Sequence, residues 1–235
     1  MLKPSQSLKE LLDELVEKYE TVEFIYDDPI QFPHRYRRVE DIEIAGFLAS
    51  MFAFGNRKAF ISKLEQLFGL LGESPYKYVI EGDFDLGGLN YRFLAESDII
   101  AVLEVLKVLY KYDGGLAGLF ERAVISGDLM GYVCEYFYSH CSDKAGAGFY
   151  FAIPNPKKGG AMKRMWMFLR WMVRKSEVDL GVWNFISTAQ LCIPLDVHVA
   201  RVSRHLGLLK RNANDKKAVE DLTAQLRLFD CHGLL

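Results

Sequence analysis

The chain has 235 residues, of which 50% are hydrophobic, and a formal net charge of −2. This length can bury a substantial core in one large domain or in two lobes. The longest uncharged apolar stretch, Ile44 to Gly55, is too short to cross a bilayer, and acids occupy the N-terminal region where a signal peptide would be apolar. The composition therefore excludes a transmembrane protein and predicts a cytoplasmic one without a membrane partner.

Helical periodicity dominates the chain, and no period-2 alternation is long enough to support a sheet. The sequence therefore predicts an all-α fold. Asp41 is predicted to cap a helix that lacks a polar face, which indicates a central helix surrounded by others. In chain order, we expect helices over about 7–19, 41–54, 57–71, a short one from 75, 97–112, 116–126, 129–142, 162–174, 196–206 and 215–228.

Composition along the chain predicts two lobes. We expect an acidic, aromatic lobe over about 40–142 and a basic lobe made of 1–39 and 143–235. Residues 1–156 hold 15 Lys and Arg against 24 Asp and Glu, whereas residues 157–235 hold 14 against 7. Between Asp143 and Gly160 the chain is rich in Gly, Ala, Pro and Lys, which predicts a loop that can approach another backbone closely.

A run of cations without any acid follows this loop. Such a local field attracts a polyanion even when the whole protein is slightly acidic, although an ordinary solvated cationic face is the alternative. The run comprises Lys157, Lys158, Lys163, Arg164, Arg170, Arg174 and Lys175.

The cysteines indicate a reducing compartment. Cys134, Cys141, Cys192 and Cys231 lie far apart and form no CxxC or Cys/His metal spacing. This spacing suggests no structural zinc. We expect no metal site and no cofactor.

Lys163 stands at the start of the helix that follows Gly159 and Gly160. The apolar stripe of this helix belongs to the core, and Lys163 begins the opposite, basic row. The positive end of the helix dipole and neighbouring Arg164 both disfavour a proton on the Lys163 amine. A lysine under such pressure can act as a nucleophile at neutral pH.

Asp196 is predicted to be the N-cap of a helix that Pro194 introduces and Gly207 ends. Its side chain can accept the backbone N–H of His198 or Val199, and the helix is expected to bury Val199, Val202 and Leu206. The helix dipole favours the ionised form of a carboxylate at this position. An ordinary capping aspartate and a fixed catalytic carboxylate remain alternatives.

These features resemble the helix-hairpin-helix DNA glycosylase superfamily. Its [VL]-D-x-H-[VI]-x-R-[VL] segment, which supplies the essential aspartate, matches the stretch from Leu195 to Val202, with Asp196 at the aspartate. The family lysine begins the second hairpin helix, where Lys163 stands. The likeness covers about residues 40–226 and implies a single glycosylase-like domain of two helical lobes.

Two departures from the family pattern indicate which type within the superfamily the chain resembles most. The segment from Ile153 to Gly160 replaces the compact Leu-Pro-Gly-x-Gly hairpin, and 33 positions separate Lys163 from Asp196. Both features are closest to the archaeal 8-oxoguanine DNA glycosylase type, and the iron–sulfur loop of the endonuclease III type is missing. The chain is also similar to an uncharacterised bacterial family with the same Pro-Leu-Asp-x-His-Val-x-Arg-Val block, as a C-terminally shortened member.

The resemblance implies base-excision repair of DNA. Lys163 would attack the sugar C1′ of a flipped, damaged nucleotide, Asp196 would stabilise the developing positive charge, and a Schiff base would permit β-lyase cleavage. It also implies a monomer that contacts phosphates and receives the flipped base. The phosphate-contacting set is Lys157, Lys158, Gly159, Gly160, Arg164, Arg170, Arg174 and Arg201. The base-pocket set is Phe54, Trp166, Trp171, Trp183 and Phe185, for which core packing is the alternative.

Two other functions stay open. The same fold could recognise DNA by shape and backbone without chemistry, an alternative that the altered hairpin favours. The chain could instead be an all-α metal phosphohydrolase with His198 and Asp196 as ligands, although an adjacent His-Asp dipeptide is missing. Arg201 and Arg204 could contact phosphate or tie the lobes together.

Overall fold

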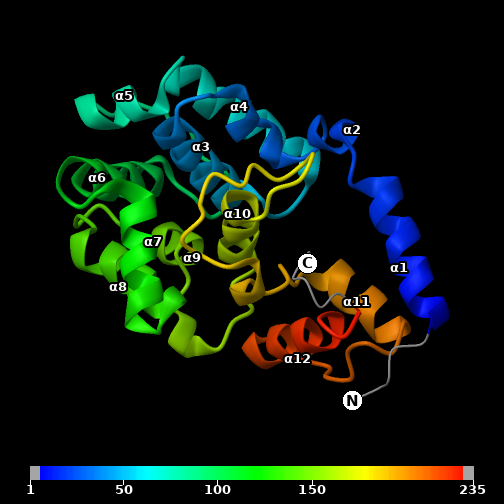
Figure 1. Cartoon of the computed structure of the whole chain (residues 1–235). Helices are drawn as coiled ribbons and strands as arrows, with labels where there is room; N and C mark the ends of the chain where they lie inside the picture. Colours follow the sequence, from blue (N-terminus) through cyan, green and yellow to red (C-terminus); the bar gives the residue numbers. More distant parts are fainter. Residues whose placement is uncertain (1–5, 230–235) are drawn as a thin grey trace. The chain divides into compact units, whose positions relative to one another are not determined.

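The computed structural model describes residues 6–229, and this part of the chain is helical and contains no β-strand. The predicted all-α fold is confirmed. The α-helices are α1 (Gln6–Tyr19), α2 (Val22–Ile25), α3 (Val39–Phe52), α4 (Arg57–Leu71), α5 (Pro75–Glu81), α6 (Glu96–Tyr112), α7 (Gly115–Ser126), α8 (Leu129–His140), α9 (Ala147–Ala152), α10 (Lys163–Val173), α11 (Val197–His205) and α12 (Lys216–Leu226), as Figure 1 shows. Short 3-10 turns cover Pro29–Gln31, Pro33–Arg35, Pro156–Lys158 and Thr188–Gln190.

The chain divides into two compact units, which we call the central unit (residues 28–156) and the terminal unit (residues 1–27 and 157–235). The central unit begins before and ends after the predicted acidic lobe, which covered about residues 40–142. At its start, the two 3-10 turns between Pro29 and Arg35 contact α3, and at its end α9 contacts α6. In the described part of the chain, no helix is both long and apolar enough to span a membrane.

Helix α3 forms the middle of the central unit, as its apolar sequence predicts. Every residue from Asp41 to Phe52 is buried, and α3 contacts α4, α5 and α7. Asp41, however, does not cap this helix, which begins two residues earlier at Val39. The Asp41 carboxylate accepts hydrogen bonds from the Ser74 hydroxyl at 2.9 Å and the Tyr76 backbone N–H at 2.8 Å. It therefore ties α3 to the first turn of α5.

A second buried carboxylate organises the segment predicted to be a loop between Asp143 and Gly160. This segment contains helix α9, whose N-cap residue Gly146 donates its N–H to Asp98 at 2.7 Å. A Cβ atom on Gly148 would collide with Asp98 and with the Phe93 carbonyl oxygen. The prediction of a loop was wrong here because a side chain distant in sequence holds the N-cap residue of this helix in place.

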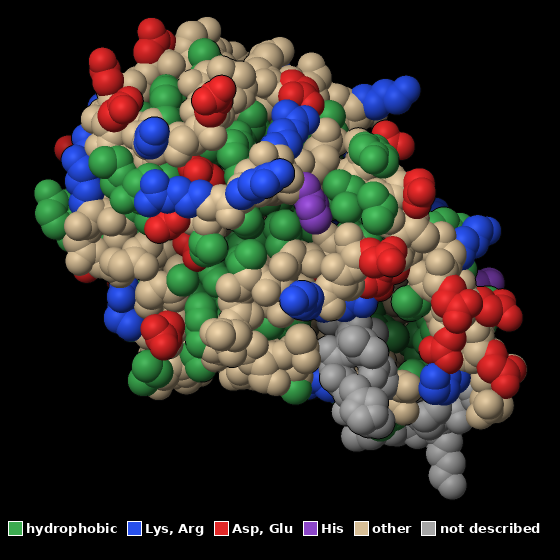
Figure 2. Space-filling model, turned by 45° about the horizontal axis from the view of Figure 1, so that its top comes forward, with side chains coloured by type: hydrophobic (Ala, Val, Ile, Leu, Met, Phe, Trp, Pro, Cys, Tyr) green, Lys and Arg blue, Asp and Glu red, His purple; other side chains and the backbone are tan. Residues whose placement is uncertain are grey.

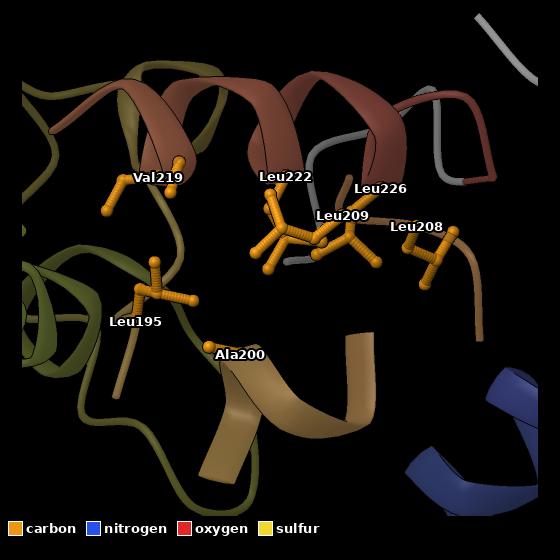
Figure 3. Close-up of a cluster of buried hydrophobic side chains, with 8 residues drawn as sticks. Leu195, Ala200, Leu208, Leu209, Val219, Leu222 and Leu226 are labelled. Atoms are coloured by element: carbon orange, nitrogen blue, oxygen red, sulfur yellow. The ribbon is translucent and has the colours of Figure 1, made fainter. Parts of the chain in front are cut away.

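The terminal unit has its own core between α11 and α12. Buried side chains of the two helices and of their flanking segments point toward one another, as Figure 3 shows. The expected apolar face of α11 was partly wrong, since Val202 is 52% exposed while Ala200 and Ser203 are buried. The helix therefore presents Ala200, in place of Val202, to the cluster that it shares with α12. The core comprises Leu195, Ala200, Leu208, Leu209, Ala218, Val219, Leu222 and Leu226.

Three of the cysteines, Cys134, Cys141 and Cys192, are free thiols. Cys231 lies outside the described residues.

Candidate active site

Asp196 is the N-cap of α11, as predicted. Its backbone is extended, and its Oδ1 atom accepts the N–H groups of His198 and Val199, both at 2.9 Å. Within the described residues, the other oxygen, Oδ2, receives no hydrogen bond. Two donors on one oxygen hold the carboxylate in place at the positive end of the helix dipole and leave the second oxygen to face another group.

Lys163 is the first residue of α10, also as predicted, and it is half-buried. The residue before it, Met162, has φ 53° in the left-handed region and is only 8% exposed. A long side chain rarely adopts this conformation, which costs on the order of 1 to 2 kcal/mol. The surrounding packing therefore imposes the turn that places Lys163 at the start of its helix.

The surroundings of Lys163 and Asp196 share one apolar core. Ala161 and Trp166, on either side of Lys163 in sequence, pack against the cluster that contains Leu195 and Ala200. Leu195 directly precedes Asp196. Both proposed catalytic residues thus stand at helix N-termini whose flanking residues pack in the same cluster of the terminal unit.

Arg164 and the loop before α10 supply positive charge next to Lys163. Burial lowers the pKa of Arg164 to about 10, which leaves its guanidinium charged at neutral pH. Lys157 and Lys158 are exposed. Gly159 has φ 72° and Gly160 forms an isolated bridge with Asp215, so the two glycines of the predicted phosphate-contacting set lie against the start of α12.

Arg170 and Arg174 serve an internal ion-pair network. Arg174 is 6% exposed and donates to Asp179 at 2.7 Å and to Glu20 at 2.6 Å. Arg170 donates to the same Asp179 carboxylate at 3.0 Å. The predicted phosphate contact of Arg174 does not fit this geometry, because its guanidinium is buried and already paired. The sequence analysis counted only the cations between Lys157 and Lys175. It missed Glu20 and Asp179, which lie outside this run and pair with its arginines.

Arg201 and Arg204, both on α11, have different surroundings. Arg201 is exposed, which is compatible with its predicted phosphate contact. Arg204 donates to the carbonyl oxygens of Arg211 and Asn212, both at 2.8 Å. It therefore anchors the loop that leads into α12, within the terminal unit.

The predicted base-pocket aromatics of the terminal unit differ in exposure. Trp171 and Trp183 are each 4% exposed, and Trp183 packs edge-on against Phe168 at 5.3 Å between ring centroids. This burial favours core packing over base contact for both tryptophans. Trp166 and Phe185 are half-buried.

Phe54 lies in the central unit, inside an exposed aromatic patch that we define as Phe54, Arg92, Phe93 and Phe151. The Phe54 ring stacks on Phe93 at 6.4 Å and meets Phe151 edge-on at 4.8 Å. Phe93 is 60% exposed, and the Arg92 guanidinium lies 5.5 Å from its ring centroid. The sequence analysis did not identify Arg92 and Phe93. A cation next to an aromatic residue between Asn90 and Leu94 could have indicated them as candidate base contacts.

No group of three His, Cys, Asp or Glu side chains suited to a metal ion occurs among residues 6–229. His198, a ligand in the phosphohydrolase alternative, is exposed, and its neighbour Asp196 uses Oδ1 as a helix cap. The described geometry therefore does not favour that alternative.

The chain matches the family model described as a protein of unknown function (DUF2400) over residues 28–232. No curated protein and no solved structure matches it.

Proposed function

We propose that this chain, which belongs to the DUF2400 family, is a DNA glycosylase that removes a damaged base in the cytoplasm through Lys163 and Asp196. The observation that carries the proposal is the pair of helix N-termini in the terminal unit. Lys163 begins α10, Asp196 caps α11, and the residues that flank both pack into one cluster. We assign the fold to the helix-hairpin-helix glycosylase type, with α10 as the helix that follows the atypical hairpin segment.

In the proposed reaction the neutral Lys163 amine forms a bond to C1′ while the C1′–N glycosidic bond breaks. The bonding electrons leave with the base, which takes up a proton. Asp196, through Oδ2, stabilises the positive charge that develops at C1′ and accepts the proton that the attacking amine loses. Opening of the sugar ring then yields a Schiff base. Removal of a C2′ proton expels the 3′ phosphate by β-elimination, and water releases Lys163.

DNA binding in this proposal uses cations that lie at the surface. Lys157, Lys158 and Arg201 are exposed, so their charge can pair with phosphate oxygens. On the face in Figure 2, Lys and Arg side chains lie beside exposed hydrophobic ones. In the central unit, the aromatic patch around Phe93 offers ring faces with an arginine, which is the chemistry that stacks unpaired bases.

Covalent trapping tests the proposed chemistry. Borohydride reduces a Schiff base to a stable amine, so the wild-type protein should form a cross-linked adduct with duplexes that carry one lesion base from a panel of oxidised bases. The lesion must be intact, because the aldehyde of a ready-made abasic site reacts with any amine. Lys163→Gln should abolish the adduct and keep DNA affinity, whereas Lys175→Gln, at an exposed lysine of the same cation run, should trap normally. A wild-type protein that binds every duplex and traps none contradicts the proposal.

A non-catalytic DNA-binding protein of the same fold is the second candidate. One observation favours it: the two hydrogen bonds to Oδ1 explain Asp196 fully as a helix cap. Binding by shape and backbone would fall steeply with added salt, and Asp196→Asn would leave every property unchanged.

A further inference from the structure

We infer that α12 is the positioning element of the proposed site, because it holds at its two ends the segments that lead into Lys163 and into Asp196. This inference rests on the proposed function. Residues of α12 are positioning residues here, since none of them is assigned a contact with substrate.

The first turn of α12 binds the loop before Lys163. The backbone N–H of Lys216 donates to the carbonyl oxygen of Gly159 at 2.8 Å, and Asp215 pairs with Gly160. The N-cap carboxylate of Asp215 accepts the N–H of Ala218 at 3.0 Å, which keeps this turn intact. The Gly159 anchor lies four residues before Lys163.

The last turn of α12 binds the segment before Asp196. The buried Thr223 hydroxyl accepts the N–H of Ile193 at 3.1 Å. Arg227, at the C-cap, donates to the carbonyl oxygens of Ala189 at 2.6 Å and Leu191 at 3.0 Å. The Ile193 anchor lies three residues before Asp196.

Between these two ends, the apolar face of α12 packs on the start of α11. Val219 and Leu222 lie in the same cluster as Leu195 and Ala200, as Figure 3 shows. An α-helix rises 1.5 Å per residue, so Lys216 and Thr223 are separated by about 10 Å along a rigid axis. The helix therefore fixes the spacing between Gly159 and Ile193. The lead-in segments, which we define as residues 159–162 before Lys163 and 193–195 before Asp196, cannot shift independently of each other.

One substitution removes the first anchor and leaves the helix able to form. Lys216 occupies the first position of α12, where proline is favourable because its fixed φ suits the helix. Asp215 has φ −120° and ψ −178°, extended values that a following proline tolerates. Lys216→Pro deletes the N–H that binds Gly159, and Lys216→Ala keeps that N–H and serves as the matched control.

At the other end, Thr223→Val removes the hydroxyl with little change in shape, and Thr223→Ser keeps it as the control. Hydrogen exchange measured by mass spectrometry on free protein should be faster around residues 159–166 in Lys216→Pro and around residues 189–196 in Thr223→Val. Each control should match the wild type. With lesion DNA, both disrupting variants should lower the single-turnover rate of adduct formation about tenfold to a hundredfold, because small misplacements have effects of this size. The dissociation constant for DNA should not change in Thr223→Val, because the segment that its hydroxyl holds contains none of the proposed phosphate contacts.

Equal exchange and equal rates in each variant and its control overturn the inference. A wild-type protein that traps no adduct on any lesion instead overturns the proposed function. The role of α12 is then judged on exchange alone: faster exchange only in Lys216→Pro and Thr223→Val supports it, and unchanged exchange overturns it.

Discussion

The Nη1 atom of Arg174 lies 2.7 Å from Oδ2 of Asp179, and the two side chains are only 7% and 1% exposed. Removing one partner of a buried ion pair leaves the other charge without compensation. We expect Arg174→Met to lower the free energy of unfolding by about 3 kcal/mol, measured by urea denaturation. Lys175→Met changes the exposed neighbour and should stay within about 0.5 kcal/mol of the wild type. Equal stability of the two variants would show that the network contributes little.

The same burial predicts how Arg174 affects DNA binding. Each lysine or arginine that contacts phosphate contributes about one to the slope of log affinity against log salt. Arg174→Met should leave this slope unchanged, because Glu20 and Asp179 already neutralise the guanidinium. Lys158→Met, at an exposed lysine, should reduce the slope by about one. Titrations of labelled duplex at several salt concentrations measure the slope for both variants. A lower slope in Arg174→Met and an unchanged slope in Lys158→Met would show that Arg174 contacts DNA.

Asp196 offers a way to separate capping from catalysis. Asparagine caps a helix as well as aspartate does, so Asp196→Asn should retain stability within about 0.5 kcal/mol. Asp196→Ala should lose about 1 kcal/mol because the N–H groups of His198 and Val199 lose their acceptor. If the charge of Asp196 serves the reaction, Asp196→Asn lowers the single-turnover rate about a hundredfold or more. An unchanged rate in Asp196→Asn would leave this residue as a cap alone.

Stability at acid pH should report on the start of α12. The hydrogen bond from Arg211, helped by the Ala218 N–H, lowers the pKa of Asp215 from its ordinary value of 3.8 to about 2. A carboxylate whose pKa is lower in the folded state stabilises the fold fully above its ordinary pKa, and this contribution disappears as pH falls through the folded value. The stability difference between wild type and Asp215→Asn should therefore be constant above about pH 5 and shrink toward pH 2. Urea midpoints across this range measure it, and a constant difference down to pH 2 would contradict the assigned pairing.

Arg92 combines an unusual backbone with an exposed position in the aromatic patch. Its φ is 53°, and the hydrogen bonds between Tyr91 and Leu94, at 2.8 and 2.9 Å, close the turn around it. Glycine adopts this conformation freely, so Arg92→Gly should be more stable than Arg92→Ala by about 1 kcal/mol. Both variants should weaken binding to single-stranded oligonucleotides equally, since both lose the guanidinium. If both bind as the wild type does, the patch does not contact DNA.

Local sequence predicted most of the helices correctly. The apolar run from Ile42 to Phe52 forms a buried central helix because it has no polar face to present to water. The cap at Asp196 also follows from local chemistry, since the acceptor and the N–H groups are two and three residues apart. Helix α9 was missed because its N-terminal support is Asp98, which is 48 residues from Gly146 along the chain.

The sequence by itself determined that this is an all-helical protein in which Lys163 and Asp196 begin two helices, because periodicity and capping act over a few residues. Only the tertiary structure decided which cations remain at the surface: Arg174 is paired with Glu20, which lies 154 positions away. Only the tertiary structure joined the lead-in segments of the two helices to opposite ends of α12, through Gly159 and Ile193. A hydrogen bond or ion pair between distant residues depends on how the whole chain packs, and no local pattern encodes it.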